Sequence, residues 1–315
     1  MVKGDGGVGV SRELCFGIDG GGSVSRLRII ERATPLEPLI TVHGKSTNIF
    51  SVGREAAAEN LSALLQQGCS KLGLDPLQLV SGCMGSAGLG RKNEQLFFKE
   101  VFSRLLPHTN MQLCNDGEIL LVGGVKKLEG YCLIAGTGSF ALGRSRDGEK
   151  VRAGGHGYML GDEGSAWWIA DQAVRRTIRS HEGRDLETSM EASLLQYFEL
   201  TELDGFVELF HHKYEKPKVA RSAPIVTEFA LRKDPLALDI ITKAVDELVA
   251  LLRSLYKRLP LIEPDLVLSG GVLENDPLIR PMVLSRLEHQ IPQITVVTDT
   301  GSALDGACIL AANNT

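Results

Sequence analysis

The chain has 315 residues, of which 43% are hydrophobic and 23% are charged, and its formal net charge is −5. These values are ordinary for a globular protein, and the length is sufficient for two domains. The acidic balance argues against a nucleic-acid partner, because binding to a phosphate backbone depends on an excess of lysine and arginine. No apolar run reaches the roughly 18 residues that a membrane helix needs, so we expect no membrane span.

The N-terminus and the cysteines indicate a cytoplasmic protein. Residues 1–10 are glycine-rich and lack the apolar centre of a signal peptide, so we expect a disordered lead-in. None of the six cysteines forms a Cys-x-x-Cys pair, and three of them lie in apolar strand-like runs. We therefore expect reduced, structural thiols rather than disulfides or a zinc site. The cysteines are Cys15, Cys69, Cys83, Cys114, Cys132 and Cys308.

Residues 18–23, with the sequence Ile-Asp-Gly-Gly-Gly-Ser, separate two apolar runs that are typical of strands, at 14–18 and 26–30. Glycine allows backbone N–H groups to approach a ligand closely, so this turn could hold phosphate oxygens. Asp19, just before the turn, could reach a Mg²⁺ ion, usually through water. Taken alone, the pattern fits a plain tight turn equally well. It is neither a P-loop nor a dinucleotide fingerprint, because no Gly-Lys-Ser/Thr follows and the next element is a strand.

Strands and helices then alternate up to residue 116. The polar loop at 43–48 could hydrogen-bond a sugar, or it could be a solvated turn. Asn115 and Asp116 follow a strand, and open α/β sheets place ligands at the carboxyl ends of their strands. An aspartate before a glycine is also common in turns. We expect strands at 39–42, 77–84 and 111–114 and helices at 53–72 and 96–105.

The pattern restarts near residue 131, where a strand leads into a second small-residue turn at 136–139. The two turns begin at Gly20 and Gly136, a separation that suits two related domains better than a short repeat. A glycine-rich loop at 154–165 precedes a helix, and Asp162 and Ser165 are both candidates for its N-cap. We further expect helices within 181–234 and at 245–255 and 302–311, and strands at 140–143, near 151, at 264–268 and at 294–297. The strand at 264–268 ends in a third glycine turn.

Three glycine turns after strands, with Asp116 at the end of a strand between the first two, resemble the actin/hexokinase/Hsp70 ATPase superfamily. The most similar branch contains the N-acetylglucosamine kinases and the BadF/BadG/BcrA/BcrD ATPases, and the resemblance extends over about residues 14–311. Residues 161–170 are similar to the N-acetylglucosamine kinase signature, and residues 46–48 to the sugar loop of those kinases. The resemblance implies an α/β fold of two facing actin-like (ribonuclease H-like) domains with the active site in the interdomain cleft. The domains would comprise 11–116 with 301–315, and 117–300.

The resemblance also assigns roles to individual residues. It implies that Asp116 is the catalytic base and that Asp19 holds Mg²⁺ through water. Three positions depart from residues that are common in relatives, which leaves the exact sugar open: Phe140, His156 and Tyr158. The residues implied to bind ATP and its phosphates are Asp19, Gly20, Gly21, Gly22, Ser23, Thr137, Gly138, Ser139, Gly270 and Gly271. Those implied to bind the sugar are Asn48, Asn115, Asp116, Gly138, His156 and Asp162.

The implied activity is ATP- and Mg²⁺-dependent transfer of the γ-phosphate to the 6-hydroxyl of N-acetylglucosamine, with N-acetylmuramic acid and glucosamine left open as acceptors. A homodimer is common among similar proteins. One alternative is an activator ATPase of a 2-hydroxyacyl-CoA dehydratase or benzoyl-CoA reductase system, which holds an iron–sulfur cluster with cysteines at a subunit interface. The position of the cysteines in apolar strands argues against it. The other is a non-catalytic sugar sensor, against which the presence of Asp116 and all three turns argues.

Overall fold

The computed structural model describes residues 12–314, so the lead-in predicted for residues 1–10 lies outside the described part. The chain forms two compact units. The first runs to Leu128 and resumes at Asp299, and the second is Glu129–Thr298. The boundary that we expected after residue 116 coincides with the start of helix α4 (Asp116–Val125), which packs against α13 (Ala303–Ala312) within the first unit.

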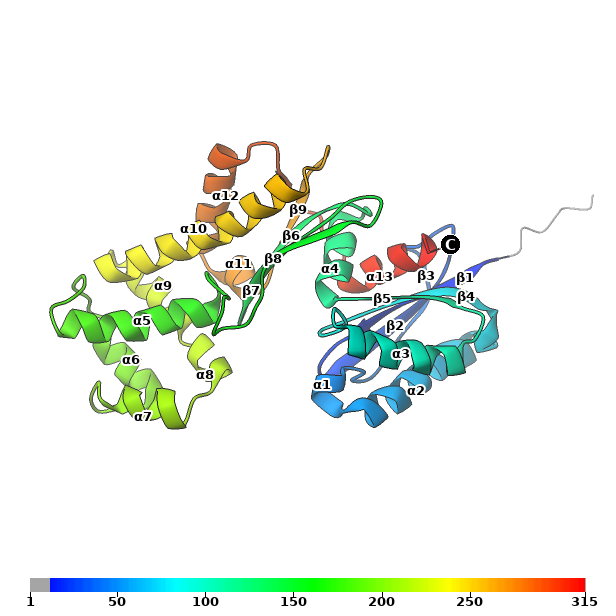
Figure 1. The fold of residues 1–315 in the computed structure, drawn as a ribbon, viewed down its shortest axis with the longest axis horizontal. Coiled ribbons are helices and arrows are strands. Elements are labelled where there is room, and N and C mark those ends of the chain that lie inside the picture. The colour runs from blue at the N-terminus through cyan, green and yellow to red at the C-terminus, as the bar shows by residue number, and fades with distance from the viewer. Residues whose placement is uncertain (1–11, 315) are drawn as a thin grey trace, which may run out of the picture. The chain divides into compact units, whose positions relative to one another are not determined.

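The first unit is a five-stranded mixed sheet with helices on both faces (Figure 1). Its strand order is β3-β2-β1-β4-β5, in which β1, β2 and β3 are antiparallel and β4 and β5 run parallel to β1. Helices α2 and α3 cover one face, and α4 and α13 cover the other. The elements are β1 (Leu14–Gly20), β2 (Val24–Glu31), β3 (Pro38–Lys45), α1 (Ile49–Val52), α2 (Arg54–Leu72), η1 (Pro76–Gln78), β4 (Leu79–Ser86), α3 (Lys92–Leu105) and β5 (Asn110–Cys114).

Strand β1 is buried on both faces, as its unbroken apolar sequence predicts. Phe16 and Ile18 point into the core that α2 and α3 cover. On the opposite face, a Cβ atom at Gly17 would lie 2.7 Å from the backbone nitrogen of Cys308 in α13. The glycine therefore allows the backbone of α13 to lie directly on the sheet, beside the strand that carries the first glycine turn.

The second unit repeats the topology of the first. Its strand order is β10-β9-β6-β7-β8, so that β6 to β10 take the places of β1 to β5. This confirms the prediction of two related α/β domains. Helix α10 packs on β6, β7 and β8, and α5, α9 and α12 pack around α10 (Figure 1). The elements are β6 (Gly130–Ala135), β7 (Ser139–Arg144), β8 (Lys150–Gly154), α5 (Ala166–His181), α6 (Glu191–Phe198), α7 (Gly205–His212), α8 (Lys216–Ala220), α9 (Ala223–Leu231), α10 (Pro235–Arg258), β9 (Asp265–Ser269), α11 (Gly271–Asn275), α12 (Ile279–Gln290) and β10 (Thr295–Val296).

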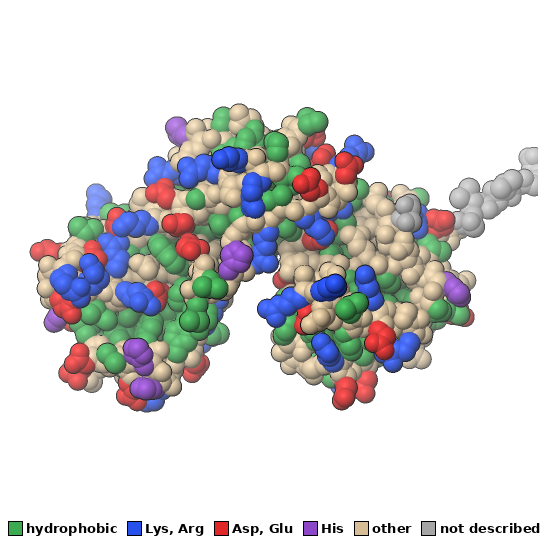
Figure 2. Space-filling view, viewed as in Figure 1, with side chains coloured by type: hydrophobic (Ala, Val, Ile, Leu, Met, Phe, Trp, Pro, Cys, Tyr) green, Lys and Arg blue, Asp and Glu red, His purple; other side chains and the backbone are tan. Residues whose placement is uncertain are grey.

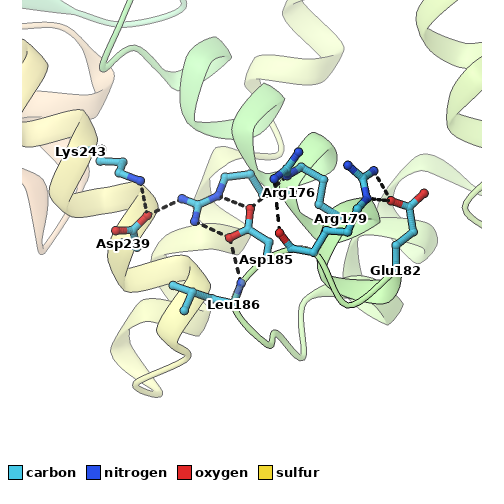
Figure 3. Close-up of polar contacts among 8 residues, drawn as sticks. Arg176, Arg179, Glu182, Asp185, Leu186, Asp239 and Lys243 are labelled. Carbon is cyan, nitrogen blue, oxygen red and sulfur yellow. Dashed lines mark hydrogen bonds and ion pairs between the residues drawn. The ribbon is translucent and has the colours of Figure 1, made fainter.

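An ion-pair network joins α5 to α10 and to the chain that follows α5. The guanidinium of Arg176 donates to Asp185, with an Nη2–Oδ1 distance of 2.8 Å, and to Asp239 of α10. Figure 3 shows the Arg176 guanidinium held between these two carboxylates. The hydrogen bonds from Arg176 hold the pKa of Asp185 well below its usual range, although partial burial opposes them. The network therefore stabilises the helical part of the second unit.

The surface carries both signs of charge. Figure 2 shows lysine and arginine side chains interspersed with aspartate and glutamate over the visible face of each unit. Two large apolar side chains, Met159 and Leu160, are about four-fifths exposed, at 81% and 79%, in the glycine-rich loop before α5.

Within residues 12–314, we find no helix with both the length and the apolar character that crossing a bilayer requires.

Candidate active site

The first glycine turn joins β1 to β2 at the carboxyl end of β1, and two serine hydroxyls fix its carbonyl groups. Ser46 donates to the carbonyl oxygen of Gly21 at 2.8 Å, and Ser86 donates to that of Gly20 at 2.7 Å. A Cβ atom at Gly20 would lie 2.9 Å from Oγ1 of Thr47, so the turn sits tightly against the loop 46–48. The backbone nitrogen of Gly21 donates to the carbonyl oxygen of Asp19 at 3.2 Å, so the N–H groups of Gly22 and Ser23 are the part of the turn suited to an anion.

Asp19 is paired with Arg26 across the β1–β2 ladder. The distance from Arg26 Nη2 to Asp19 Oδ2 is 2.5 Å, and the Asp19 side chain is 16% exposed. A carboxylate beside a phosphate-binding turn has the hard oxygen donors that Mg²⁺ prefers. Direct coordination through Oδ2 would compete with Arg26, whereas contact through a water molecule leaves the ion pair intact. The residue thus fits the predicted outer-sphere role better than an inner-sphere one.

Asn48 is buried in the loop that follows β3. Its Oδ1 atom accepts a hydrogen bond from the backbone nitrogen of Phe50 at 2.9 Å, which caps the short helix α1. Asn60 fixes the same loop by donating to the carbonyl oxygen of Ser46 at 2.8 Å. Since the Asn48 side-chain oxygen accepts within the protein, its amide NH₂ is the group that suits a sugar hydroxyl.

Asn115 and Asp116 begin α4 at the carboxyl end of β5. Asn115 is the N-cap, and its Oδ1 accepts from the backbone nitrogen of Gly117 at 2.8 Å. Asp116 is the first helical residue rather than a turn residue, and its side chain is exposed. Strands β1, β4 and β5 are parallel neighbours, so their carboxyl ends share one edge of the sheet. With strands about 4.8 Å apart, Asp116 and the first glycine turn lie on the order of 10 Å from each other.

The second glycine turn, between β6 and β7, contacts a buried carboxylate in the same unit. Asp162 is 4% exposed, and its Oδ1 lies 3.4 Å from the backbone nitrogen of Ser139. The Ser139 hydroxyl donates to the carbonyl oxygen of Glu163 at 2.6 Å. A Cβ atom at Gly138 would lie 2.9 Å from Asp162 Oδ2. The loop at 154–165 therefore folds back onto the turn and brings Gly138, Ser139 and Asp162 together.

The two N-cap candidates of α5 have different roles. The Ser165 hydroxyl accepts from the backbone nitrogen of Trp168 at 3.2 Å, so Ser165 caps the helix. Asp162 has a left-handed backbone, with φ of 62°, and its Oδ2 lies 2.8 Å from Nζ of Lys216 at the start of α8. Asp162 is thus free of the capping role. Lys216 is a site residue that we did not predict, because it is 54 positions away and belongs to no recognisable motif.

The third glycine turn follows β9, which runs parallel to β6. Gly270 has φ of 97°, and a Cβ atom there would lie 2.4 Å from the carbonyl oxygen of Ala135, so the second and third turns are in contact. They border a cavity of about 660 Å³ whose walls come mainly from α5, α9 and α11. The lining is largely apolar, with polar groups that include Thr137, Arg221 and Asn275.

The three residues that depart from the common pattern of relatives have distinct surroundings. His156 is exposed in the glycine-rich loop. The guanidinium carbon of Arg152 lies over the Phe140 ring, 4.9 Å from the centre of that ring. The Tyr158 ring lies 5.4 Å from Nζ of Lys216 and stacks on Tyr214. Of the three, Tyr158 is therefore the one that contacts the cation bound to Asp162.

The sequence profile of the BadF/BadG/BcrA/BcrD ATPase family matches residues 16–308. The chain belongs to this family. It is 28% identical over 299 residues to an N-acetylmuramic acid/N-acetylglucosamine kinase of Clostridium acetobutylicum, covering 94% of this chain and 97% of the relative. It is 27% identical to an N-acetyl-D-glucosamine kinase of Dictyostelium discoideum, covering 97% of this chain and 99% of the relative.

The fold of this family member also occurs in solved structures. A candidate N-acetylglucosamine kinase from Chromobacterium violaceum matches with a TM-score of 0.69 and 24% identity, covering 95% of this chain and 99% of that structure. This similarity confirms the two-domain, actin-like α/β fold that the family resemblance implied.

Proposed function

We propose that this family member is an ATP-dependent amino-sugar kinase that transfers the γ-phosphate to the 6-hydroxyl of N-acetylglucosamine. The proposal rests above all on the contact of a phosphate-type glycine turn, Gly138–Ser139, with the buried carboxylate of Asp162. A kinase must hold a phosphoryl group beside a hydroxyl acceptor. In this contact the glycine turn suits the phosphoryl group, and the carboxylate suits the sugar hydroxyls. Both amino-sugar kinases found by comparison align along nearly the whole chain, which supports the same activity. N-acetylmuramic acid and glucosamine are further acceptors to be tested.

The cavity of about 660 Å³ is proposed to hold the adenosine of ATP. Its volume and apolar walls suit a nucleoside, and Gly136, Thr137 and Gly271 border it. The triphosphate would then follow the second glycine turn, where the N–H groups of Thr137 and Gly138 would bind its oxygens, because those of Gly136 and Ser139 donate to the Gly138 carbonyl and to Asp162. The first turn, at 20–23, would supply a second set of N–H donors. Mg²⁺, when bound, supplies charge neutralisation at the phosphates, and Asp19 would hold it through water.

For the sugar, we propose that Asp162 accepts hydrogen bonds from ring hydroxyls and that Asn48 and Asn115 donate to them. Asp116 would take the proton of the 6-hydroxyl as its oxygen attacks the γ-phosphorus. The new O–P bond forms as the bond from the γ-phosphorus to the bridging oxygen breaks, and ADP leaves. The N–H groups of the glycine turns would stabilise the charge on the transferred group.

A coupled assay of ADP release over a panel of amino sugars tests the proposal. We expect release that requires Mg²⁺ and that N-acetylglucosamine stimulates, with a phosphorylated sugar as product. Wild-type protein that hydrolyses ATP at the same rate with and without every sugar would contradict it. Tight sugar binding without turnover would favour the sensor instead.

The activator reading is not favoured. All six cysteines are buried, whereas a cluster at a subunit interface needs thiolates at the surface. Burial raises the pKa of the Cys308 thiol to about 12, which keeps it protonated and a poor iron ligand. Iron in stoichiometric amount in protein purified without oxygen would support the activator and contradict the kinase.

A further inference from the structure

Lys216 is the charged partner of the carboxylate that we assign to the sugar. Its Nζ atom lies 2.8 Å from Asp162 Oδ2, and the two side chains are 27% and 5% exposed, respectively. The Lys216 ammonium is therefore half-buried, whereas the carboxylate is almost fully enclosed. A ligand that reaches Asp162 would meet the ammonium beside it.

The surroundings of Lys216 hold its side chain in place. The ammonium lies 5.4 Å from the ring centre of Tyr158. That ring packs on Trp167 at 5.1 Å and on Tyr214 at 5.5 Å. The indole nitrogen of Trp167 donates to the Tyr214 hydroxyl, which joins these two rings to each other. A cation over such an aromatic group is positioned before any ligand arrives.

Lys216 also stands apart from the nucleotide cavity. It is the first residue of α8, while Ala220 and Arg221, at the other end of this helix, line that cavity. Four residues of helix separate the two ends by roughly 6 Å. The helix therefore presents a cation to the acceptor side and different residues to the nucleotide side.

A neutral sugar gives no reason for a cation at this position, because Asp162 can accept hydrogen bonds from hydroxyls without one. An ammonium has three N–H donors, so the bond to Asp162 leaves capacity for a second carboxylate. We propose that Lys216 is a specificity-determining residue that binds a carboxylate substituent on the acceptor, so that the site accepts acidic amino sugars as well as neutral ones. This inference rests on the proposed kinase function.

The test compares N-acetylmuramic acid, which carries a carboxylate, with the neutral N-acetylglucosamine. We expect wild-type protein to phosphorylate both sugars. The substitution Lys216→Met should lower kcat/KM for the acid at least about tenfold more than for the neutral sugar, the usual effect of losing a charge-assisted hydrogen bond. Lys216→Arg keeps the charge and should recover part of the preference. Added salt should raise KM for the acid more strongly in wild type than in Lys216→Met.

The matched control is Lys213→Met, which removes the same charge from an exposed side chain that pairs with the surface residue Glu208 at the end of α7. It should leave the ratio of the two kcat/KM values unchanged. Equal losses for both sugars in Lys216→Met would overturn the inference and assign Lys216 to positioning Asp162. A rise in KM for ATP would overturn it in favour of phosphate binding. Wild type that phosphorylates only the neutral sugar would overturn it while leaving the kinase function intact, and wild type that phosphorylates neither sugar would overturn both.

Discussion

The carboxylate of Asp162 lies against the α-carbon of Gly138, so closely that a Cβ atom at position 138 would be 2.9 Å from Oδ2. Gly138 is not among the glycines with positive φ, so the backbone angles do not demand glycine here. Glycine is required at position 138 because the carboxylate approaches so closely. The same carboxylate is held from its other side by Lys216, which limits how far it can retreat.

Gly138→Ala should therefore displace the Asp162 carboxylate and weaken sugar binding, with a moderate loss of stability. A methyl group at this position forces the carboxylate outward, because contacts below about 3 Å are not tolerated. We expect KM for N-acetylglucosamine to rise about tenfold, with a loss of unfolding free energy of about 1–3 kcal/mol. Steady-state kinetics and urea unfolding measure the two effects. An unchanged KM for the sugar would mean that Asp162 has no part in sugar binding.

Much of the fold could be predicted because its signals are local. Strands β1, β6 and β9 are largely apolar runs that each end at a glycine turn, and each turn occurs at its predicted position. Helices α4 and α12 were not predicted. In α4, glycine lowers helix propensity, yet a Cβ at Gly123 would lie 1.9 Å from the carbonyl oxygen of Ser302. Close packing against α13 thus requires the residue that obscures the helix in the sequence.

The site could be predicted only in part, for a related reason. Asp162 was recognised within a motif, but its two roles could not be separated without its backbone angle and its contacts. Ser86 and Lys216 act through neighbours 66 and 54 positions away, and such pairs leave no periodic pattern. Motifs therefore identify the groups suited to ligands, while the residues that orient those groups become visible only in three dimensions.

The pairing of Arg176 with Asp185 predicts a pH-dependent contribution to stability. Because the pKa of Asp185 is lowered in the folded protein, its contribution is complete above the unfolded pKa of about 3.9 and is lost as the pH falls through the folded value. Asp185→Asn should cost about 1.5–3 kcal/mol at pH 7, and the difference from wild type should shrink at pH 3. Urea unfolding at the two pH values measures this.

The control for that experiment is Asp246→Asn, which breaks a surface pair with Arg286 whose side chains are 53% and 43% exposed, respectively. An exposed pair contributes about 0–1 kcal/mol, so this variant should change stability little at either pH. A cost for Asp185→Asn that stays the same at pH 3 would show that it arises from packing rather than from charge.

Asp116 provides the direct test of general base catalysis. Asp116→Asn should lower kcat roughly 10²–10⁴-fold, because an amide cannot accept the proton of the 6-hydroxyl. Since the residue lies in the first turn of α4, losing its charge should also cost about 0.3–1 kcal/mol of stability. Single-turnover kinetics measures the first effect and thermal unfolding the second, with sugar binding by calorimetry retained. Turnover close to wild type would exclude Asp116 as the base.

Asp162→Asn separates charge from backbone conformation at the proposed sugar ligand. Asparagine tolerates the left-handed backbone at φ of 62°, so the loop should keep its shape. Loss of the charged acceptor should raise KM for the amino sugar about tenfold or more, with KM for ATP nearly unchanged. The melting temperature should also fall, because Lys216 loses its charged partner, so KM for the sugar is the deciding measurement. Steady-state kinetics with each substrate varied in turn measures the change.

Ser165→Ala is the reciprocal variant, because Ser165 is the residue that caps α5. Removing its hydroxyl leaves the backbone nitrogen of Trp168 without its partner and should cost about 0.5–2 kcal/mol of stability. KM for the sugar should change much less than in Asp162→Asn, since the carboxylate keeps its contacts with Gly138 and Lys216. Thermal unfolding and sugar kinetics on both variants give a crossed comparison. If Asp162→Asn lowers the melting temperature and leaves KM for the sugar unchanged, Asp162 is structural and the assignment of this loop to the sugar is wrong.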